Sequence, residues 1–408
     1  MSTLKVDAIR HNSATSDAIT MASDGTCTAK LTSINGGSQL SHRNIVINGG
    51  MTIAQRAVSS VTNGYTFVDR FQTNVASLST GGDVTRSQQS LSSSDTGPWQ
   101  AGFRKYARMA TVAAGTAAAG SSIDFYTHIE ATDMANSGWD YTSASGKITL
   151  SFWFRCSANQ TFYTYLRSRD GTEQGYTFAF TASGNNTWTK ITHTIPGNSN
   201  ITFSDNNGTG LSIYWIPYYG TSYTNNKTLN TWAAHSGSNT SPDMATTWLT
   251  SGAATWDITG IQLEVGDTAT PFEHRSFGEE LSLCYRYYYK LGKLDYISQH
   301  MSAGEQYCIG MSDNDNLNIY GMINFPVFMR TPPTGIDATS AGNYRVRRDT
   351  TQTCTGVPTF IDAAHHYCRV NFPKSSHGWG TGQMLWCQSG GSGSYLSLIH
   401  ISEPTRPY

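Results

Sequence analysis

The stretch Ile148–Cys156 reads ITLSFWFRC, and its alternation decides the predicted fold. Every second position carries a large apolar side chain, namely Ile148, Leu150, Phe152 and Phe154. The positions between them hold Thr149, Ser151, Trp153 and Arg155. Because successive side chains of a strand point to opposite faces of a sheet, this pattern predicts a strand with one buried face. The outer face would carry polar and aromatic groups.

The same alternation recurs between residues 65 and 275, in runs bounded by Gly, Asn and Ser turns. The clearest runs are Thr161–Arg167, Tyr176–Phe180, Thr189–Ile195, Leu211–Trp215 and Ile261–Val265. Several short strands with polar turns are typical of a two-sheet sandwich. The sequence therefore predicts an all-β fold whose main domain, residues 65–275, is a jelly-roll β-sandwich.

The region before the sandwich has a different composition. Residues 1–43 are poor in aromatic side chains and rich in Ser, Thr and Gly, so they cannot bury a core of their own. We predict an extended N-terminal segment that becomes ordered by intertwining with identical chains; the alternative is a floppy tail. Residues 44–64 are expected to be a connector.

A change of period marks the end of the sandwich. In residues 276–291, SFGEELSLCYRYYYKL, apolar side chains recur every three or four positions, with two glutamates early and a lysine late. This pattern predicts a short helix whose charges suit its dipole, within a connector over 276–293. A second, small C-terminal β module is predicted over 294–395, with strands near Gln306–Met311, Leu317–Phe325 and Tyr367–Phe372.

Composition excludes several classes of partner. The chain has 408 residues, with 27 Lys and Arg against 28 Asp and Glu and a formal net charge of -1. Neutralising phosphates needs a basic surplus, so no nucleic acid is expected as a partner. No apolar run approaches the roughly 18 residues of a membrane span, so no membrane insertion is expected. The seven scattered cysteines and the lack of a secretory pattern predict synthesis in a reducing cytosol without disulfides.

Sugar binding needs flat aromatic faces for the C–H side of a pyranose and polar groups for its hydroxyls. Alternation places both kinds of group on the outer side of the predicted strands. Together with one loop tryptophan, the candidate ligand-binding residues are Trp153, Arg155, Tyr163, Tyr165, Arg167, Tyr214, Trp232 and Glu264. If their strands are neighbours, they form one wall. In the alternative, the outer faces are covered, the rings form a second core layer, and Arg155 pairs with Glu264.

A second candidate surface is the stretch from Trp215 to Trp248, where aromatic residues are set among Gly, Ser and Asn. These aromatic residues are Trp215, Tyr218, Tyr219, Tyr223, Trp232 and Trp248. Tyrosine among small polar residues is typical of adaptable binding loops on a rigid scaffold. The alternative is that Trp232 and Trp248 pin a long loop to the sandwich.

Signals for catalysis and metal binding are weak. The sequence has no Gly-x-Ser-x-Gly elbow, no His-Glu-x-x-His pair and no Gly-rich phosphate loop. Glutamates cluster between residues 264 and 280, but nothing predicts that two of them converge as a glycosidase pair. The set Cys354, His365, His366 and Cys368 fits no common zinc spacing. Asp69 and Asp257 are eligible calcium ligands without a spacing that singles them out. We predict no catalytic residue, no metal and no cofactor.

Four pieces of the chain together carry a resemblance to a known family. The first is Arg43–Met51 with Ala54–Arg56 and Tyr65–Phe71, and the second is Gly146–Phe154 with Asn186–Lys190 and Ile195–Gly197. The third is Ile258–Gly266 with Ala269–Glu273 and Arg275–Ser276, and the fourth is Cys284–Tyr288 with Phe325–Val327, Met329–Arg330 and Pro332–Pro333. Over residues 43–335 the chain resembles tail-fibre proteins of tailed bacteriophages that carry a carbohydrate-binding-module-like jelly roll.

This resemblance implies a homotrimeric appendage of the phage virion, made in the host cytoplasm and assembled with other virion tail proteins. It fixes no catalytic residue and no sugar-contacting position. From it we expect recognition of the host cell surface through a glycan or other receptor, without cleavage. The alternatives are a polysaccharide-degrading tail-fibre enzyme and a purely structural virion fibre with no ligand contact.

The last residues differ from the rest of the chain. Ser397–Tyr408 reads SLIHISEPTRPY and resembles the translated read-through of a sequencing adapter. We therefore expect residues 396–408 to be a non-native tail, which would leave the second β module truncated. The alternative is a genuine tail.

Overall fold

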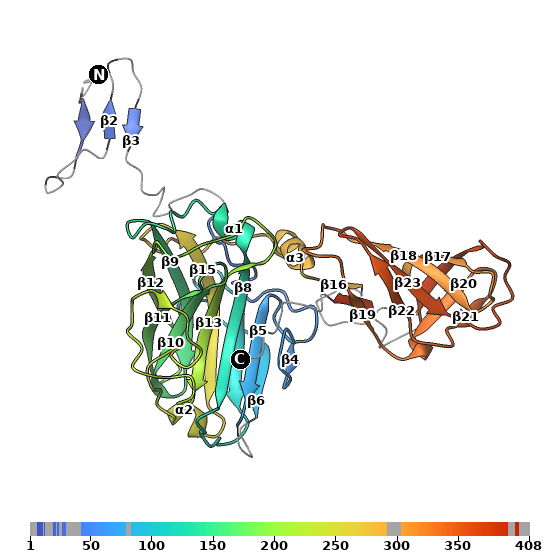
Figure 1. Ribbon diagram of the computed structural model, residues 1–408, viewed down its shortest axis with the longest axis horizontal. Coiled ribbons are helices and arrows are strands. Elements are labelled where there is room, and N and C mark those ends of the chain that lie inside the picture. Colours follow the sequence, from blue (N-terminus) through green and yellow to red (C-terminus); the bar gives the residue numbers. More distant parts are fainter. Residues whose placement is uncertain are drawn as a thin grey trace.

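The computed structural model describes residues 6–10, 12, 19–21, 23, 27–29, 42–78, 83–291, 303–390 and 396–399. Within them, two six-stranded antiparallel sheets form a sandwich (Figure 1). The β13 sheet has the order β14 (Ala233–Ala234), β11 (Gln174–Ser183), β10 (Asn159–Ser168), β13 (Thr209–Tyr219), β8 (Ser122–Glu130), β5 (Phe71–Ala76). The β9 sheet has the order β12 (Thr189–Pro196), β9 (Lys147–Cys156), β15 (Thr255–Val265), β7 (Lys105–Thr111), β6 (Val84–Ser90), β4 (Ser59–Ser60). The chain crosses repeatedly between the sheets, and the predicted all-β jelly-roll fold is confirmed.

The core lies between the two sheets and is rich in aromatic rings. Phe152 and Phe154 of β9 point inward, as their alternation predicts, and both have almost no exposed surface. Phe152 packs edge-on against Trp215 of β13 with ring centroids 5.9 Å apart, and Phe154 packs against Trp256 of β15 at 5.2 Å. Such edge-to-face pairs add to the gain from burial alone. Two short helices, α1 (Ala131–Ala135) and α2 (Thr247–Thr250), flank the sheets.

Residues 44–56, expected in the connector, belong to the sandwich instead. Val46, Met51 and Ile53 are completely buried. The segment lies along β15, since the Ile45 amide donates to the Leu263 carbonyl and the Asn44 side chain bonds the β15 backbone. Its apolar residues follow no strand period, which is why the sequence pattern did not reveal their burial.

The helix after the sandwich is shorter than predicted. Helix α3 (Phe277–Tyr285) is preceded by Ser276, whose side chain accepts a hydrogen bond from the Glu279 amide. This is a standard N-cap. The remaining residues form strand β16 (Tyr288–Leu291), which pairs with β25 (Leu396–Ile399). Pairing with a strand more than 100 positions away overrides the local helical period.

The second β module is built on a seven-stranded sheet. Its order is β21 (Thr351–Thr353), β20 (Tyr344–Arg347), β24 (Met384–Ser389), β17 (Gln306–Ser312), β18 (Asn318–Asn324), β23 (Tyr367–Pro373), β22 (Thr359–Ala363). The three strands expected here are confirmed as β17, β18 and β23. A three-stranded sheet, β16–β25–β19 (Gly335–Ala338), joins this module to α3, and a 3-10 turn covers Ala341–Asn343.

The two ends of the chain are described in part. Strands β1 (Ala8–Ile9), β2 (Ile19–Met21) and β3 (Cys27–Ala29) pair with one another. The other residues of the predicted intertwining segment lie mostly outside the described residues, so that segment stays a prediction. Residues 396–399 form β25, whereas 400–408 lie outside the description; the non-native origin of this tail also stays a prediction. Among the described residues, no helix is long and apolar enough to span a membrane.

Candidate functional site

A row of tyrosines crosses the outer face of the β13 sheet. Tyr126 of β8 lies opposite Tyr214 of β13, which in turn lies opposite Tyr165 of β10. The rings of Tyr126 and Tyr214 are stacked with centroids 4.9 Å apart, and those of Tyr214 and Tyr165 are 6.1 Å apart. This aromatic row results from strand register, because directly opposite side chains on one face are neighbours.

A polar row runs beside the aromatic row on the same face. His128, Ser212 and Arg167 occupy successive register positions on β8, β13 and β10. His128 Nδ1 and Ser212 Oγ lie 2.7 Å apart. Arg167 binds Glu173, which also lies 3.7 Å from Arg169. The face therefore presents hydrogen-bonding groups next to ring surfaces, and this combination suits a ligand with both hydroxyls and C–H faces.

One end of the aromatic row opens into a hollow of about 360 Å³ between the sheet and the following loop. Its lining consists of Tyr165, Arg167, Tyr214, Tyr219, Tyr223, His235, Gly237 and Thr240. A small cluster of Tyr163, Tyr165, Tyr214, Ile216 and Tyr219 forms the floor beneath the loop. Gly175 of β11 makes this floor possible, since a Cβ there would lie 2.2 Å from the Tyr165 hydroxyl.

Charge in the hollow is carried by arginine rather than histidine. The His235 ring nitrogen Nδ1 is 2.6 Å from the Tyr165 hydroxyl. Burial, assisted by the nearby Arg167 charge, lowers the pKa of His235 to about 4, so this ring is neutral near pH 7. Burial also raises the pKa of Tyr165. At neutral pH the hollow thus offers uncharged hydroxyl and imidazole groups together with one guanidinium.

A buried carboxyl group lies on the same face of β8, two positions before Tyr126. Asp124 of β8 has no exposed surface and accepts hydrogen bonds from the Tyr219 hydroxyl and from Asn74 Nδ2. Burial raises its pKa to about 7, and the two hydrogen bonds oppose the rise. Since the pKa of an unfolded aspartate is near 3.8, the folded protein favours the protonated form.

We expect Asp124 to make folding stability pH-dependent. Its contribution is complete below about pH 4 and is lost as pH rises towards about 7, by at most about 1.4 kcal/mol per pH unit. Asp124→Asn should therefore be more stable than wild type at pH 8, with an advantage that shrinks as pH falls to 4. Urea unfolding of both proteins between pH 4 and 8 measures this difference. Parallel curves would contradict the assignment.

The structure brings three of the eight predicted binding residues together at the hollow, namely Tyr165, Arg167 and Tyr214. Tyr163 lies on the same face, but it packs into the floor and is 9% exposed. The two tyrosines at the hollow are also largely covered. The alternative in which the outer rings form a second core layer is therefore correct for the floor of the hollow. Beside this floor, the hollow itself remains open.

The predicted single wall is wrong, because three of its members lie on the opposite sheet. Trp153 and Arg155 are on β9 and Glu264 is on β15, on the outer side of the β9 sheet. Trp153 is half-buried in a separate hollow with Phe103, Phe272 and His274. Sequence alternation gives the face of each strand but does not give the sheet to which the strand belongs.

Arg155 and Glu264 have structural partners, and they do not pair with each other. Arg155 bonds Asp95 at 2.6 Å and Asp257 at 2.7 Å. Glu264 is completely buried and accepts hydrogen bonds from the amide and hydroxyl of Thr270, at 2.9 and 2.6 Å. Neither side chain is directed at a ligand surface, so both predicted roles are corrected.

Trp232 also acts as an anchor. Its ring is 7% exposed and packs 5.2 Å from Tyr176 in the main core, and its Nε1 donates to the Pro196 carbonyl. Trp248 is completely buried. The alternative in which these two residues pin the loop is therefore the correct one, although Tyr219 and Tyr223 of the same stretch do reach the hollow.

Sequence reasoning missed Tyr126, His128 and His235. The first two lie in β8, whose sequence SIDFYTHIE alternates between apolar and polar residues as clearly as β9 does. The alternation of β8 therefore could have revealed both residues from the sequence. His235 follows the two-residue strand β14, which no period marks, and it reaches Tyr165 through loop packing.

Metal ligands do not gather in the described part of the chain. No group of three or more His, Cys, Asp and Glu side chains is arranged to hold an ion there. The two eligible calcium ligands are already engaged: Asp257 binds Arg108 and Arg155, and Asp69 accepts from the amide and side chain of Gln55.

Comparison with known proteins gives only distant similarities. No family model and no curated protein matches the chain. Among solved structures, the enzymatically active domain of tailspike protein 4 from bacteriophage CBA120 is 9% identical with a TM-score of 0.29, over 55% of this chain and 21% of that one. TmCBM61 in complex with beta-1,4-galactotriose is 9% identical with a TM-score of 0.27, over 54% and 97%. The CBM22-1–CBM22-2 tandem domain of Paenibacillus barcinonensis Xyn10C is 9% identical with a TM-score of 0.24, over 80% and 90%.

Proposed function

We propose that this chain is a glycan-binding protein that holds its ligand on the outer face of the β13 sheet. The observation that carries the proposal is the cross-strand row Tyr126–Tyr214–Tyr165, with its parallel polar row and the adjoining hollow. A sugar ring can pack its C–H face on Tyr223, the partly exposed tyrosine of the hollow, while its hydroxyls bond Arg167 and His235. The rings of Tyr165 and Tyr214 are largely covered and support this surface from below. Tyr223, from the loop after β13, also lines the hollow.

We propose binding without cleavage. Most glycoside hydrolases use two carboxyl groups that flank the bond to be broken. The described residues that line the hollow include no aspartate or glutamate. Two carboxylates near the hollow have other tasks, because Glu173 holds Arg167, and Asp124 is buried on the sheet face, where it accepts from Tyr219. These features support recognition as the role of the hollow.

The biological setting that we propose is a bacteriophage tail fibre that attaches the virion to the host surface. The support is the resemblance of residues 43–335 to tail-fibre proteins. A single shallow sugar site typically reaches a Kd of only about 1 mM. Several copies on one fibre raise the overall affinity by about 100-fold or more without new contacts. Useful attachment therefore needs an oligomer, which we propose to be a homotrimer.

An exposed apolar surface in the second module supports assembly. Its side chains form one face of the seven-stranded sheet and are Ile309, Met311, Met322, Met384 and Trp386, each between 41% and 67% exposed. Strand register places Ile309 opposite Trp386, and Met311 opposite both Met384 and Tyr320. Large contiguous apolar patches on soluble proteins mark interfaces, and Met and Trp are enriched there. We propose that a second copy covers this surface.

Glycan binding is tested by replacing residues at the rim of the hollow. Tyr223→Ala and Arg167→Gln should each weaken glycan binding about tenfold or more, because each removes a ring contact or a charged hydrogen bond. Both side chains are partly exposed, so the fold should persist. Arrayed glycans identify a ligand, and calorimetry with the wild type and the variants measures the change.

Trp153→Ala is the matched control, since it removes a half-buried ring from the outer face of the other sheet. It should change glycan affinity by less than about twofold. Loss of binding in this variant, with retention in the two rim variants, would move the site to the β9 sheet. Shortening of a host polysaccharide by the wild type would instead establish the enzymatic alternative.

A further inference from the structure

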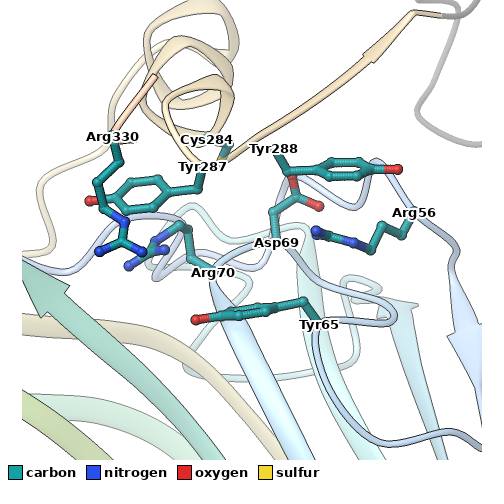
Figure 2. Close-up of a pocket in the computed structure, with 8 residues that line it drawn as sticks. All are labelled: Arg56, Tyr65, Asp69, Arg70, Cys284, Tyr287, Tyr288 and Arg330. Atoms are coloured by element: carbon teal, nitrogen blue, oxygen red, sulfur yellow. The ribbon is translucent and has the colours of Figure 1, made fainter. Parts of the chain in front are cut away.

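A second pocket lies where the sandwich, α3 and the second module meet (Figure 2). It has an open volume of about 440 Å³, and its lining consists of Arg56, Tyr65, Asp69, Arg70, Cys284, Tyr287, Tyr288 and Arg330. None of these residues belongs to the hollow on the β13 sheet. All eight come from the first and fourth of the sequence pieces that carry the tail-fibre resemblance. Segments that are up to 274 positions apart therefore converge on one space.

The lining carries a surplus of positive charge. Three guanidinium groups face one carboxylate, Asp69, in a partly desolvated space. Burial raises the pKa of Asp69, so its negative charge is itself disfavoured. Acidic groups outside the lining also act on these arginines: Glu130, itself held by Arg286 and Tyr287, and Asp133 act on Arg70, and Asp337 acts on Arg56. Attraction between charges strengthens as water is excluded, so such a lining favours an anionic ligand.

Arg56 is the arginine of the pocket whose N–H groups are best placed to donate hydrogen bonds to a ligand. Its guanidinium lies 3.5 Å from the centroid of the Tyr288 ring and 5.7 Å from that of Tyr65. Its charge acts on Asp69 and Asp337, but no hydrogen bond or ion pair joins it to any part of the chain that the structure describes. Figure 2 shows it between the two rings, directed into the pocket. Arginine binds carboxylate and phosphate groups through paired hydrogen bonds.

The other two arginines are fixed by the surrounding structure. Arg70 stacks on the Tyr287 ring at 3.3 Å and donates to the His128 carbonyl. Arg330 donates to the Asn207 carbonyl at 2.7 Å, and Asn207 returns a hydrogen bond to the Arg330 carbonyl. Such contacts hold both groups at the pocket before any ligand arrives, which lowers the ordering cost of binding.

We propose that this pocket binds a small oxyanion, a carboxylate or phosphate group carried on a sugar-sized ring. The oxyanion accepts hydrogen bonds from Arg56 and is attracted by Arg70 and Arg330, while the ring packs on Tyr65. The same chemistry could come from a uronic acid unit or from a sugar phosphate. This site is separate from the glycan-binding hollow, and either proposal can fail without the other.

Calorimetry on the full chain with glucuronate, glucose 1-phosphate, inorganic phosphate and neutral glucose tests the pocket. We expect one of the two ring-bearing anions to bind and glucose not to bind, and the better anion identifies the source. Arg56→Gln should weaken this binding about tenfold or more. Arg104→Gln is the matched control, because Arg104 also stacks on an aromatic ring, 3.8 Å from Trp99, at a different place.

Three results would overturn the proposal. They are undetectable anion binding by the wild type, equal binding by Arg56→Gln and wild type, and loss of anion binding in Tyr223→Ala, which would place the anion in the β13 hollow. Arg56→Lys separates charge from geometry, since it keeps the positive charge but loses the planar pair of donors. We expect this variant to bind more weakly than wild type and more tightly than Arg56→Gln.

Discussion

Asp257→Ala is expected to lower the free energy of unfolding by about 3–5 kcal/mol. The side chain of Asp257 is completely buried on β15 and bonds two arginines, Arg108 through two hydrogen bonds of 2.8 Å each and Arg155 at 2.7 Å. Removing the carboxylate leaves two partly buried guanidinium groups beside an empty space, with only Arg155 keeping Asp95 as a partner. Chemical denaturation followed by tryptophan fluorescence measures the loss.

The control is Asp362→Ala in the second module. Asp362 also binds an arginine, Arg369, through several hydrogen bonds, but both side chains are about half exposed. Exposed ion pairs contribute about 0–1 kcal/mol, so this variant should unfold almost as the wild type does. If both variants lost the same free energy of unfolding, burial would not decide the strength of these ion pairs. That result would contradict the stabilising role assigned to Asp257.

The double variant Ile309→Lys with Trp386→Lys is expected to convert the proposed oligomer to monomers. The two side chains face each other across β17 and β24 in the exposed apolar surface. Two added charges would have to be desolvated in any interface formed there, and each desolvation costs several kcal/mol. Light scattering coupled to size-exclusion chromatography measures the mass of wild type and variant at several concentrations.

Val61→Lys with Val112→Lys is the matched control, since these valines are 65% and 61% exposed on the sandwich rather than on the apolar surface. It should keep the mass of the wild type. A wild type that is monomeric at every concentration, or a lysine variant of the apolar surface that remains assembled, would contradict the proposed interface.

Local patterns predicted the strands well because the side-chain period of a strand is a local property. The alternation in residues 148–156 predicted both the strand β9 and its buried face. Burying Phe152 and Phe154 removes two large apolar rings from water, and only one face of the strand carries such rings. The same reasoning placed Tyr165 and Tyr214 on an outer face. These predictions needed no knowledge of which strands are neighbours.

The layout of the site depends on long-range pairing, which the sequence pattern does not contain. Trp153 and Tyr165 have equivalent patterns, yet β9 and β10 lie in different sheets, so the two rings are on opposite sides of the sandwich. The partner of Arg155 is Asp257, about 100 positions away, rather than Glu264, the partner in the alternative of a covered outer face. The burial of Val46 and Met51 also depends on tertiary contacts with β15.

Hydrogen–deuterium exchange with and without bound glycan tests the central claim most directly. Once an arrayed glycan that binds has been identified, saturating amounts of it should slow exchange in β10, in β13 and in the loop that carries Tyr223 and His235. Exchange in β9 and β12 should stay unchanged. Protection confined to the β9 sheet around Trp153, or to the second module, would contradict the assignment of the glycan site to the outer face of the β13 sheet.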